Sequence, residues 1–376
     1  MLSSLSRRLL ALLSRAAAVL VGAVVALLFC VASFSSAYEI LGHSRDFQAL
    51  GMVLLPLYVV FCVVVHEAGH AAAARLCGWK VHLISIMGLA YRPATGQFHR
   101  TGREWRARSG FVFATPRDDG AWDRSWAVVV LGGPLANFAT AGILYTVMEA
   151  VQIGPRLTGL MGGIALCSLT MGLANLMPFA RGPHRKSDGG HLLDMILGRK
   201  LSADMRDAYR VTGLVYDRVP LDGWDAALIA RLESAKPAPQ FDATRISALV
   251  NYYLVRGDVR RAHANMEGWA RSTDVPRTFA PARAFLVAIV ERDPDKAEKI
   301  LESTPEAMRK SSFNYLRTAA IILALRGRDE AARAAAARAR VAARKYAVNL
   351  DKDDELIFQS IERGEPVPDR FEREAA

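Results

Sequence analysis

The chain has 376 residues, enough for two units of ordinary size, with 52% hydrophobic and 23% charged residues. This mixture favours a chain that is part membrane-embedded and part soluble. The net charge of +11 would suit a nucleic-acid partner, but the basic residues are accounted for largely by membrane topology, so we expect no nucleic acid. The four cysteines are scattered and form no CxxC pair, which argues against a disulfide framework or a thiolate metal site.

Four stretches are long and apolar enough to cross a bilayer, which takes about 20 residues. In chain order they are Ala16–Phe34, about Ala49 to Val65, Trp126–Met148 and Leu157–Ala180. The first follows several arginines and could be a cleaved signal peptide. Its apolar core is longer than the usual core of such a peptide, so we expect a membrane anchor.

The basic residues predict the orientation of these spans, because cytoplasmic loops carry an excess of Lys and Arg. Arginines precede the first span, the loop Lys80–Arg124 is rich in them, and Arg181 to Lys186 follow the last span. The short loops around Arg45 and Arg156 are poor in basic residues. We therefore expect a multi-pass protein of the plasma (inner) membrane, with its N-terminus, active-site side and C-terminal domain in the cytoplasm.

The loop between the second and third spans, residues 79–125, contains KVHLISIMGLAYRP and SGFVFATP. Alternating apolar residues and aromatics of this kind are typical of strands. We expect a small β-rich element on the cytoplasmic side, near the end of the second span.

The second span ends in the sequence VVVHEAGHAAAARLCGW. On a helix, His66 and His70 lie one turn apart on one face, where both imidazoles can reach one Zn²⁺, and Glu67 lies beside that face as a candidate general base. Such a motif arises by chance in about one chain in a hundred, and the alternative is two surface histidines on an ordinary helix. Three ionisable residues at membrane depth are costly and usually functional, so the pattern predicts a metal site.

Two further passages complete a resemblance to the site-2 protease family of intramembrane zinc metalloproteases. GGPLAN occupies Gly132–Asn137 in the third span, and NLMP occupies Asn175–Pro178 and is followed by DGG at Asp188–Gly190. The chain resembles that family over about Ala49 to Asp194, as a core of three transmembrane helices preceded here by one extra span.

The resemblance implies His66, His70 and Asp188 as the zinc ligands and Glu67 as the general base for a metal-activated water. It implies hydrolysis of a peptide bond in or near the transmembrane segment of a membrane-protein substrate. It also implies that the zinc lies toward the cytoplasm, in agreement with the orientation that the basic residues predict.

The resemblance further implies that Asn137 and Asn175 line the site and bind the substrate backbone or the oxyanion. Gly132–Pro134 can keep the third helix thin and kinked, and Pro178 can end the fourth. A scissile peptide must be extended before it is attacked. We expect the β-rich loop to offer an edge for that strand.

One departure concerns the segment FARGPHRKS, which separates Pro178 from Asp188 by more residues than the family has there. An insertion at this place could push Asp188 out of register, which would make His184, His191 or Asp194 the third ligand. Because DGGH keeps the aspartate followed by glycine, we expect Asp188.

From about Leu201 the chain turns to Ala, Arg, Asp and Glu with helical periodicity. Ser247–Arg271, Ala284–Ser303 and Tyr315–Ala343 each predict two helices around a short turn, with alanines such as Ala262, Ala297 and Ala331 where helices approach closely. The pattern loosely resembles tetratricopeptide-like hairpins, and a generic helical bundle is an equal alternative. We expect this domain to bind the substrate or a protein regulator.

The sequence thus predicts an all-α membrane protein of about four transmembrane helices with a small β-rich loop, followed by a soluble α-helical repeat or bundle domain. Its predicted divisions are an anchor at 1–48, a protease core at 49–198 and a helical domain at 199–376. The predicted activity is that of a zinc-dependent intramembrane endopeptidase. The alternative is a catalytically inactive membrane scaffold that acts through its helical domain.

Overall fold

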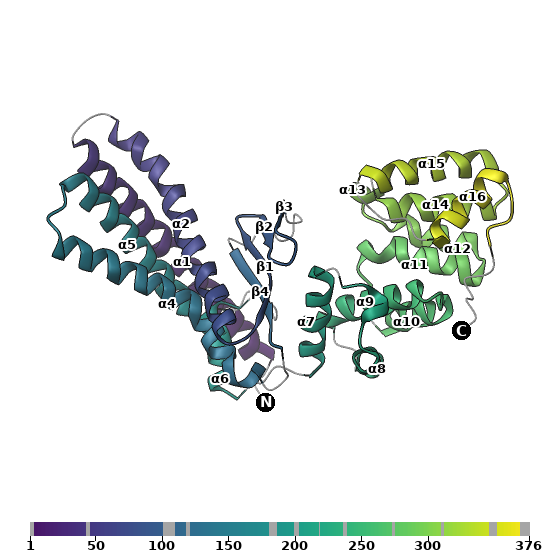
Figure 1. Cartoon of the computed structure of the whole chain (residues 1–376), viewed down its shortest axis with the longest axis horizontal. Coiled ribbons are helices and arrows are strands. Elements are labelled where there is room, and N and C mark those ends of the chain that lie inside the picture. Colours follow the sequence, from purple (N-terminus) through teal and green to yellow (C-terminus); the bar gives the residue numbers. More distant parts are fainter. Residues whose placement is uncertain are drawn as a thin grey trace. The chain divides into compact units, whose positions relative to one another are not determined.

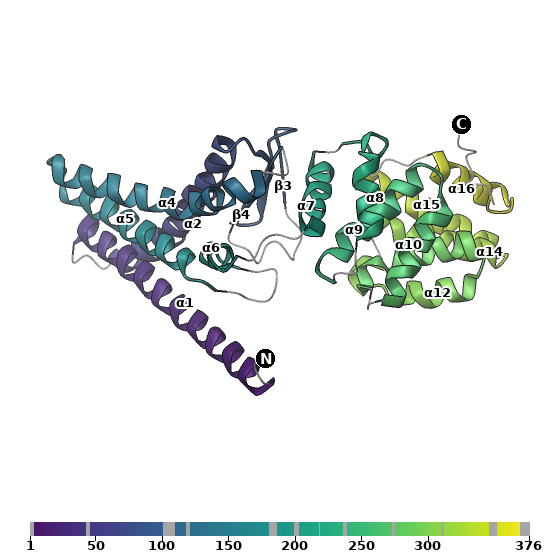
Figure 2. The same ribbon diagram turned by 90° about the horizontal axis from the view of Figure 1, so that it is seen from below.

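The computed structural model describes residues 4–42, 46–100, 110–117, 121–179, 186–198, 203–217, 219–235, 239–272, 275–309, 312–345 and 352–368. The chain forms two compact units. The first comprises residues 1–202 with 213–218, and the second comprises 203–212 with 219–376. Figures 1 and 2 show the elements of each unit from two directions.

Four long helices of the first unit correspond to the four predicted spans: α1 (Ser4–Leu41), α2 (Phe47–Leu76), α4 (Ala121–Ala150) and α5 (Pro155–Leu176). All four are long and apolar enough to cross a membrane, which indicates a multi-pass integral membrane protein. Helix α5 ends at Leu176, four residues before the predicted end, because the residue before Pro178 is extended.

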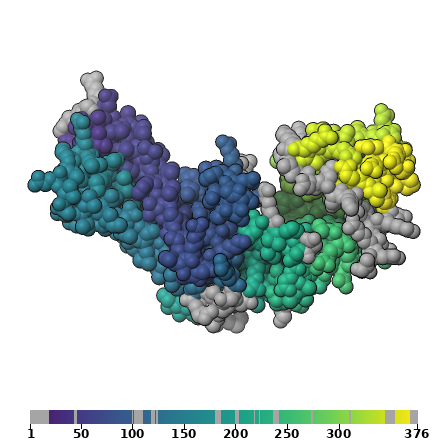
Figure 3. All heavy atoms as spheres, viewed as in Figure 1, coloured from purple at the N-terminus to yellow at the C-terminus, as the bar shows by residue number. Residues whose placement is uncertain are grey.

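Helix α1 packs against α2 and α5 rather than lying apart from the family-like core. Its Ser36 hydroxyl is buried and donates hydrogen bonds to the carbonyl oxygens of Ala32 (2.8 Å) and Gly159 (2.7 Å). At Gly163 of α5, a Cβ would collide with Ser36 and would lie 2.8 Å from the Tyr58 ring of α2. Small residues let these three helices approach closely, as is usual in membrane bundles. Figure 3 shows the heavy atoms of the chain as spheres.

The loop after α2 forms a four-stranded antiparallel sheet in the order β3-β2-β1-β4, which confirms the predicted β element. The strands are β1 (Lys80–Ile86), β2 (Leu89–Arg92), β3 (Gln97–Arg100) and β4 (Gly110–Thr115). A two-residue turn joins β1 to β2, and both of its residues have positive φ, as hairpin turns of this length require. Strand β4 pairs with β1 and lies at one end of the described sheet.

Asp217, which follows helix α7 (Ala203–Tyr216) and belongs to the first unit, makes polar contacts with this sheet. Asp217 lies 2.9 Å from Nδ1 of His82 and 2.7 Å from the Lys80 ammonium, and Nε2 of His82 makes a 2.7 Å hydrogen bond with the Thr115 hydroxyl. Burial lowers the pKa of His82 despite the carboxylate beside it. We call Lys80, His82, Thr115 and Asp217 the sheet latch.

The second unit is helical. It contains η1 (Leu221–Gly223), α8 (Ala226–Ser234), α9 (Pro239–Val255), α10 (Val259–Ser272), η2 (Arg277–Phe279), α11 (Ala280–Leu286), the π-helical turn η3 (Val287–Glu291), α12 (Pro294–Glu302), α13 (Glu306–Arg309), α14 (Phe313–Leu325), α15 (Asp329–Lys345) and α16 (Lys352–Arg363). The three predicted helix pairs are α9 with α10, α11 with α12 and α14 with α15. The tetratricopeptide-like repeat itself stays a prediction.

The alanines at the tight helix approaches are largely where the sequence predicts them. Ala262 and Ala297 are fully buried. The prediction for Ala331 is wrong, because that side chain is exposed and the next residue, Ala332, is buried instead. A helix buries one face, so a shift of one position turns a side chain from the core to the solvent.

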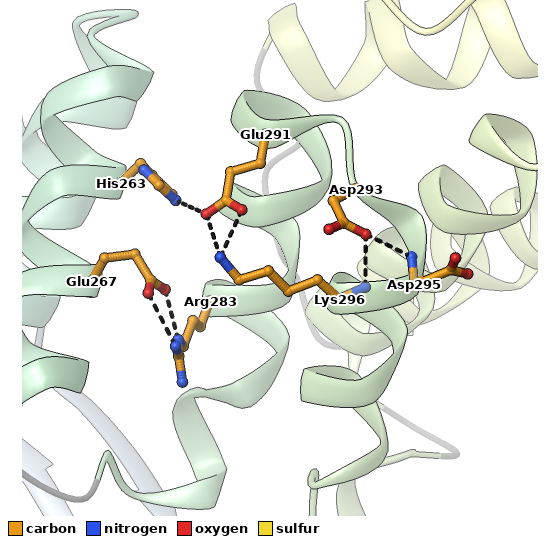
Figure 4. Close-up of polar contacts among 7 residues, drawn as sticks. All are labelled: His263, Glu267, Arg283, Glu291, Asp293, Asp295 and Lys296. Carbon is orange, nitrogen blue, oxygen red and sulfur yellow. Dashed lines mark hydrogen bonds and ion pairs between the residues drawn. The ribbon is translucent and has the colours of Figure 1, made fainter.

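Charged side chains connect neighbouring helices of this unit, as Figure 4 shows. Glu267 of α10 receives two hydrogen bonds from Arg283 of α11, at 2.7 and 3.0 Å. The Lys296 ammonium of α12 contacts Glu291, and the Asp293 carboxylate caps the N-terminus of α12. Ion pairs as exposed as that of Lys296 add little stability. We therefore infer that these contacts mainly set how the neighbouring helices are aligned.

Candidate metal centre

The HExxH residues lie in the last turns of α2, on the side toward α4 and α6. The imidazoles of His66 and His70 are nearly perpendicular, with ring centroids 4.7 Å apart and Nε2 atoms 3.1 Å apart. His66 and Glu67 are buried, and His70 is half-buried. The motif therefore presents two imidazole nitrogens to one point, as the helical spacing predicts.

Helix α6 (Asp188–Ile196) brings the Asp188 carboxylate to the same point. Its Oδ2 lies 3.0 Å from Nε2 of His66 and 3.5 Å from Nε2 of His70. Two tetrahedral zinc ligands at about 2.05 Å from the metal lie about 3.3 Å apart, so these separations fit a zinc ion. Burial would raise the pKa of Asp188, but its contacts with the two histidines outweigh burial and lower the pKa to about 2.

The insertion before Asp188 is closed at its base. The amide of Ser187 donates to the Phe179 carbonyl (3.0 Å), and the amide of Phe179 donates to the Ser187 hydroxyl oxygen (3.0 Å). That oxygen also accepts from the Gly190 amide and so caps α6. The chain thus returns to the end of α5 directly before Asp188, and the insertion leaves the aspartate beside the histidines.

Glycine is required at the second residue of α6. A Cβ at Gly189 would collide with the Leu176 carbonyl, where α6 packs on the end of α5. The glycine after the aspartate therefore has a physical role, which is to let α6 begin in contact with the backbone of α5.

The rival ligands occupy other positions. The His191 ring packs edge to face on Trp126, with centroids 5.7 Å apart. The Asp194 carboxylate contacts the Lys186 ammonium. His184 lies outside the described residues. Among the residues that the structure describes, His66, His70 and Asp188 form the candidate metal group.

The orientation of His70 is set by the backbone of α4. Its Nδ1 lies 2.8 Å from the Val129 carbonyl oxygen and 3.3 Å from the Gly133 amide nitrogen. A single nitrogen cannot both donate to the carbonyl and accept from the amide. Donation to Val129 is the shorter contact, and it leaves the lone pair of Nε2 directed at the metal position.

Glycines in α4 make room for the two imidazoles. A Cβ at Gly133 would collide with Nε2 of His70 and would lie 2.7 Å from Nε2 of His66. A Cβ at Gly132 would lie 2.6 Å from the Gly69 carbonyl oxygen of α2. This part of GGPLAN therefore keeps α4 thin where it crosses α2, as the sequence predicts, although α4 continues as a helix through Pro134.

Glu67 lies between α2 and strand β4. A Cβ at Gly110, the first residue of β4, would lie 2.7 Å from Cγ of Glu67. The carboxylate oxygen Oε2 is buried and has no hydrogen-bond partner among the described residues. A buried carboxylate oxygen without a partner is costly, which makes Glu67 a candidate functional residue.

The two asparagines differ in their hydrogen bonds. Asn137 of α4 is fully buried, and neither its amide nitrogen nor its oxygen has a partner among the described residues. Asn175 of α5 already donates to the Met171 carbonyl at 3.0 Å. Of the two, Asn137 therefore keeps its full hydrogen-bonding capacity.

Sequence reasoning missed two groups of contacting side chains. The sheet latch joins His82 to Asp217, and no spacing rule connects residues so far apart in the chain. A cluster of three tryptophans (Trp79, Trp122 and Trp126) contacts α6, and only the four-residue spacing of Trp122 and Trp126 hinted that two of them share a helix face.

Residues 54–159 match the model of a family described as Peptidase family M50, the site-2 protease family. No curated protein and no solved structure matches the chain. The matched stretch contains HExxH, the sheet and α4, and it ends before Asp188. The protein is a metallopeptidase, a hydrolase that acts on peptide bonds, and its protease class implies protein substrates. The matched residues 54–159 form an M50 domain.

Proposed function

We propose that the protein is a zinc-dependent intramembrane endopeptidase in which His66, His70 and Asp188 hold the zinc and Glu67 is the general base. The observation that carries the proposal is the convergence of one aspartate oxygen and two imidazole nitrogens within 3.0 to 3.5 Å of one another. Three protein ligands leave a fourth position open, as catalytic zinc sites require.

The residues around the centre support general-base chemistry. A zinc ion held by His66, His70 and Asp188 would supply a water molecule that can lose its proton near neutral pH and attack a peptide carbonyl. The partnerless Oε2 of Glu67 can accept the proton that this attack releases. The amide of Asn137 can donate a hydrogen bond to the carbonyl oxygen as negative charge develops on it.

The substrate that fits this site is an extended segment of a membrane protein. The centre lies on a candidate span, which favours cleavage in or near the bilayer. Helical hydrogen bonds would shield a scissile carbonyl, so the segment must unwind. Strand β4 begins beside Glu67 and pairs with β1, so we propose that its other edge takes up the substrate as an added strand.

The setting of the reaction follows from the charge distribution. The basic loops support a plasma (inner) membrane protein with the centre, the N-terminus and the helical domain on the cytoplasmic side. None of the described residues of the helical domain belongs to the metal group, and we propose that this domain binds the substrate or a protein regulator.

A cleavage assay in reconstituted vesicles tests the proposal, with a single-span model protein as the substrate. Glu67→Gln should lower the cleavage rate by at least about 100-fold, the usual contribution of a general base. Glu149→Gln, at the far end of α4, is the matched control and should cleave at the wild-type rate. A metal chelator should abolish cleavage, and added zinc should restore it.

Unchanged cleavage by Glu67→Gln, or after chelation, would contradict the proposal. A wild-type protein that binds membrane proteins through its helical domain, yet cleaves nothing with zinc supplied, would favour the scaffold.

A further inference from the structure

Three tryptophans form one aromatic cluster beside the metal centre. Trp79 stacks on Trp126, with ring centroids 5.6 Å apart and planes 23° apart, and both rings contact Trp122 at 4.9 and 5.8 Å. Trp79 follows α2 directly, and its indole N–H donates to the Ser125 hydroxyl at 2.7 Å. Trp122 and Trp126 belong to α4. The cluster therefore joins the helix of the two histidines to the helix that orients His70.

The same cluster reaches α6. The Trp126 and His191 rings meet at an interplanar angle of 89°, a favourable edge-to-face arrangement. His191 lies three residues after Asp188 on a helix, so both lie on the same side of α6. One aromatic contact thus connects α4 to the part of α6 that carries the third ligand.

We propose that the Trp126–His191 contact positions α6 so that Asp188 reaches the zinc, with Trp79 and Trp122 holding Trp126 in place. The proposal rests on the proposed function, because it assumes that Asp188 is a ligand. It makes Trp126 and His191 positioning residues, and it explains why the histidine nearest to Asp188 in sequence faces a tryptophan.

Other contacts of α6 act together with this pair. The Ser187 cap, the close approach at Gly189 and the Asp194–Lys186 ion pair join α6 to the end of α5 and to the residues directly before it. A helix held at one end can still swing about that end. The Trp126–His191 pair adds a contact with α4 one turn further along, and it limits how far α6 can turn about the end that carries Asp188.

Zinc affinity of the detergent-purified full chain tests this inference, measured by competition with a chromophoric chelator. Trp126→Leu and His191→Leu remove one ring each and should weaken zinc binding by about tenfold or more, as loss of an outer-shell contact does. Trp126→Phe and His191→Phe keep an aromatic ring and should bind zinc within about threefold of wild type. Recovery in the aromatic variants would show that the ring contact, and not the imidazole nitrogens of His191, supports zinc binding.

Trp269→Leu is the matched control. Trp269 makes an edge-to-face pair of the same kind with Phe279 in the second unit, with centroids 5.1 Å apart. Its loss should leave zinc affinity unchanged. If Trp126→Leu does not yield folded protein, the two His191 variants decide the question alone.

Two results would overturn the inference. Unchanged zinc affinity in His191→Leu would make the contact simple packing. Loss of zinc in His191→Phe as complete as in Asp188→Ala would make His191 a ligand rather than a positioning residue. Both results presuppose zinc in the wild-type protein, whereas a wild type that binds no zinc would overturn the proposed function itself.

Discussion

At Gly133 the lack of a side chain makes room for the two histidines of the proposed metal centre. The space that a Cβ would occupy lies against the nitrogens of His66 and His70 that face the proposed metal position. Any side chain would push the imidazoles apart or force α4 away from α2. Glycine is therefore needed at this position because of the space that the two histidines occupy, and not because of the backbone conformation.

Gly133→Ala should weaken zinc binding by at least about tenfold, because ligand geometry is sensitive to small displacements of its supports. Gly142→Ala, on the same helix, is the control, because a Cβ there meets nothing within 4 Å. Zinc affinity and the cleavage rate measure the effect. Equal affinities in the two variants would show that α4 can move without cost.

At the scale of elements, the sheet latch makes the first unit sensitive to acid. Burial lowers the folded-state pKa of His82, against the effect of Asp217 and with that of Lys80. The Asp217 pKa is also lowered, because its contacts with Lys80 and His82 outweigh burial. Groups whose pKa is lowered on folding stabilise the fold above their unfolded-state pKa, and that stability is lost as the pH falls.

The thermal unfolding temperature should therefore decrease as the pH is lowered from 7.5 to 5.5, a range that contains the unfolded-state pKa of about 6.5 for histidine. His82→Gln cannot titrate, so its midpoint should change less over this range. Equal slopes in wild type and His82→Gln would exclude the latch as the cause.

The sequence predicts features that depend on local patterns, and it does not predict contacts between separate elements. The HExxH helix, the spans, the β-rich loop and the helix pairs follow from spacing and hydropathy, which are local. The contacts of Glu67 with Gly110 and of Trp126 with His191 depend on how separate elements pack. The periodicity of the sequence does not reveal these contacts. It also does not reveal that the contacts between Ser187 and Phe179 close the insertion.

At the scale of the whole molecule, α1 belongs to the bundle of the first unit. Gly163→Ala should destabilise that unit by about 1 to 3 kcal/mol, because its Cβ would overpack the space that Ser36 and Tyr58 fill. Gly162→Ala is the neighbouring control, because a Cβ there would meet only the Met148 sulfur, at 3.9 Å. Thermal unfolding in detergent measures both. Equal midpoints would show that α1 is loosely packed.

The zinc content of the detergent-purified protein tests the central claim most directly. We expect near-stoichiometric zinc in the wild type and in Glu67→Gln, which keeps all three proposed ligands, and a sharp loss in Asp188→Ala. Zinc retained in Asp188→Ala would contradict the ligand set, and a wild type that takes up no zinc even after reconstitution would contradict the protease itself.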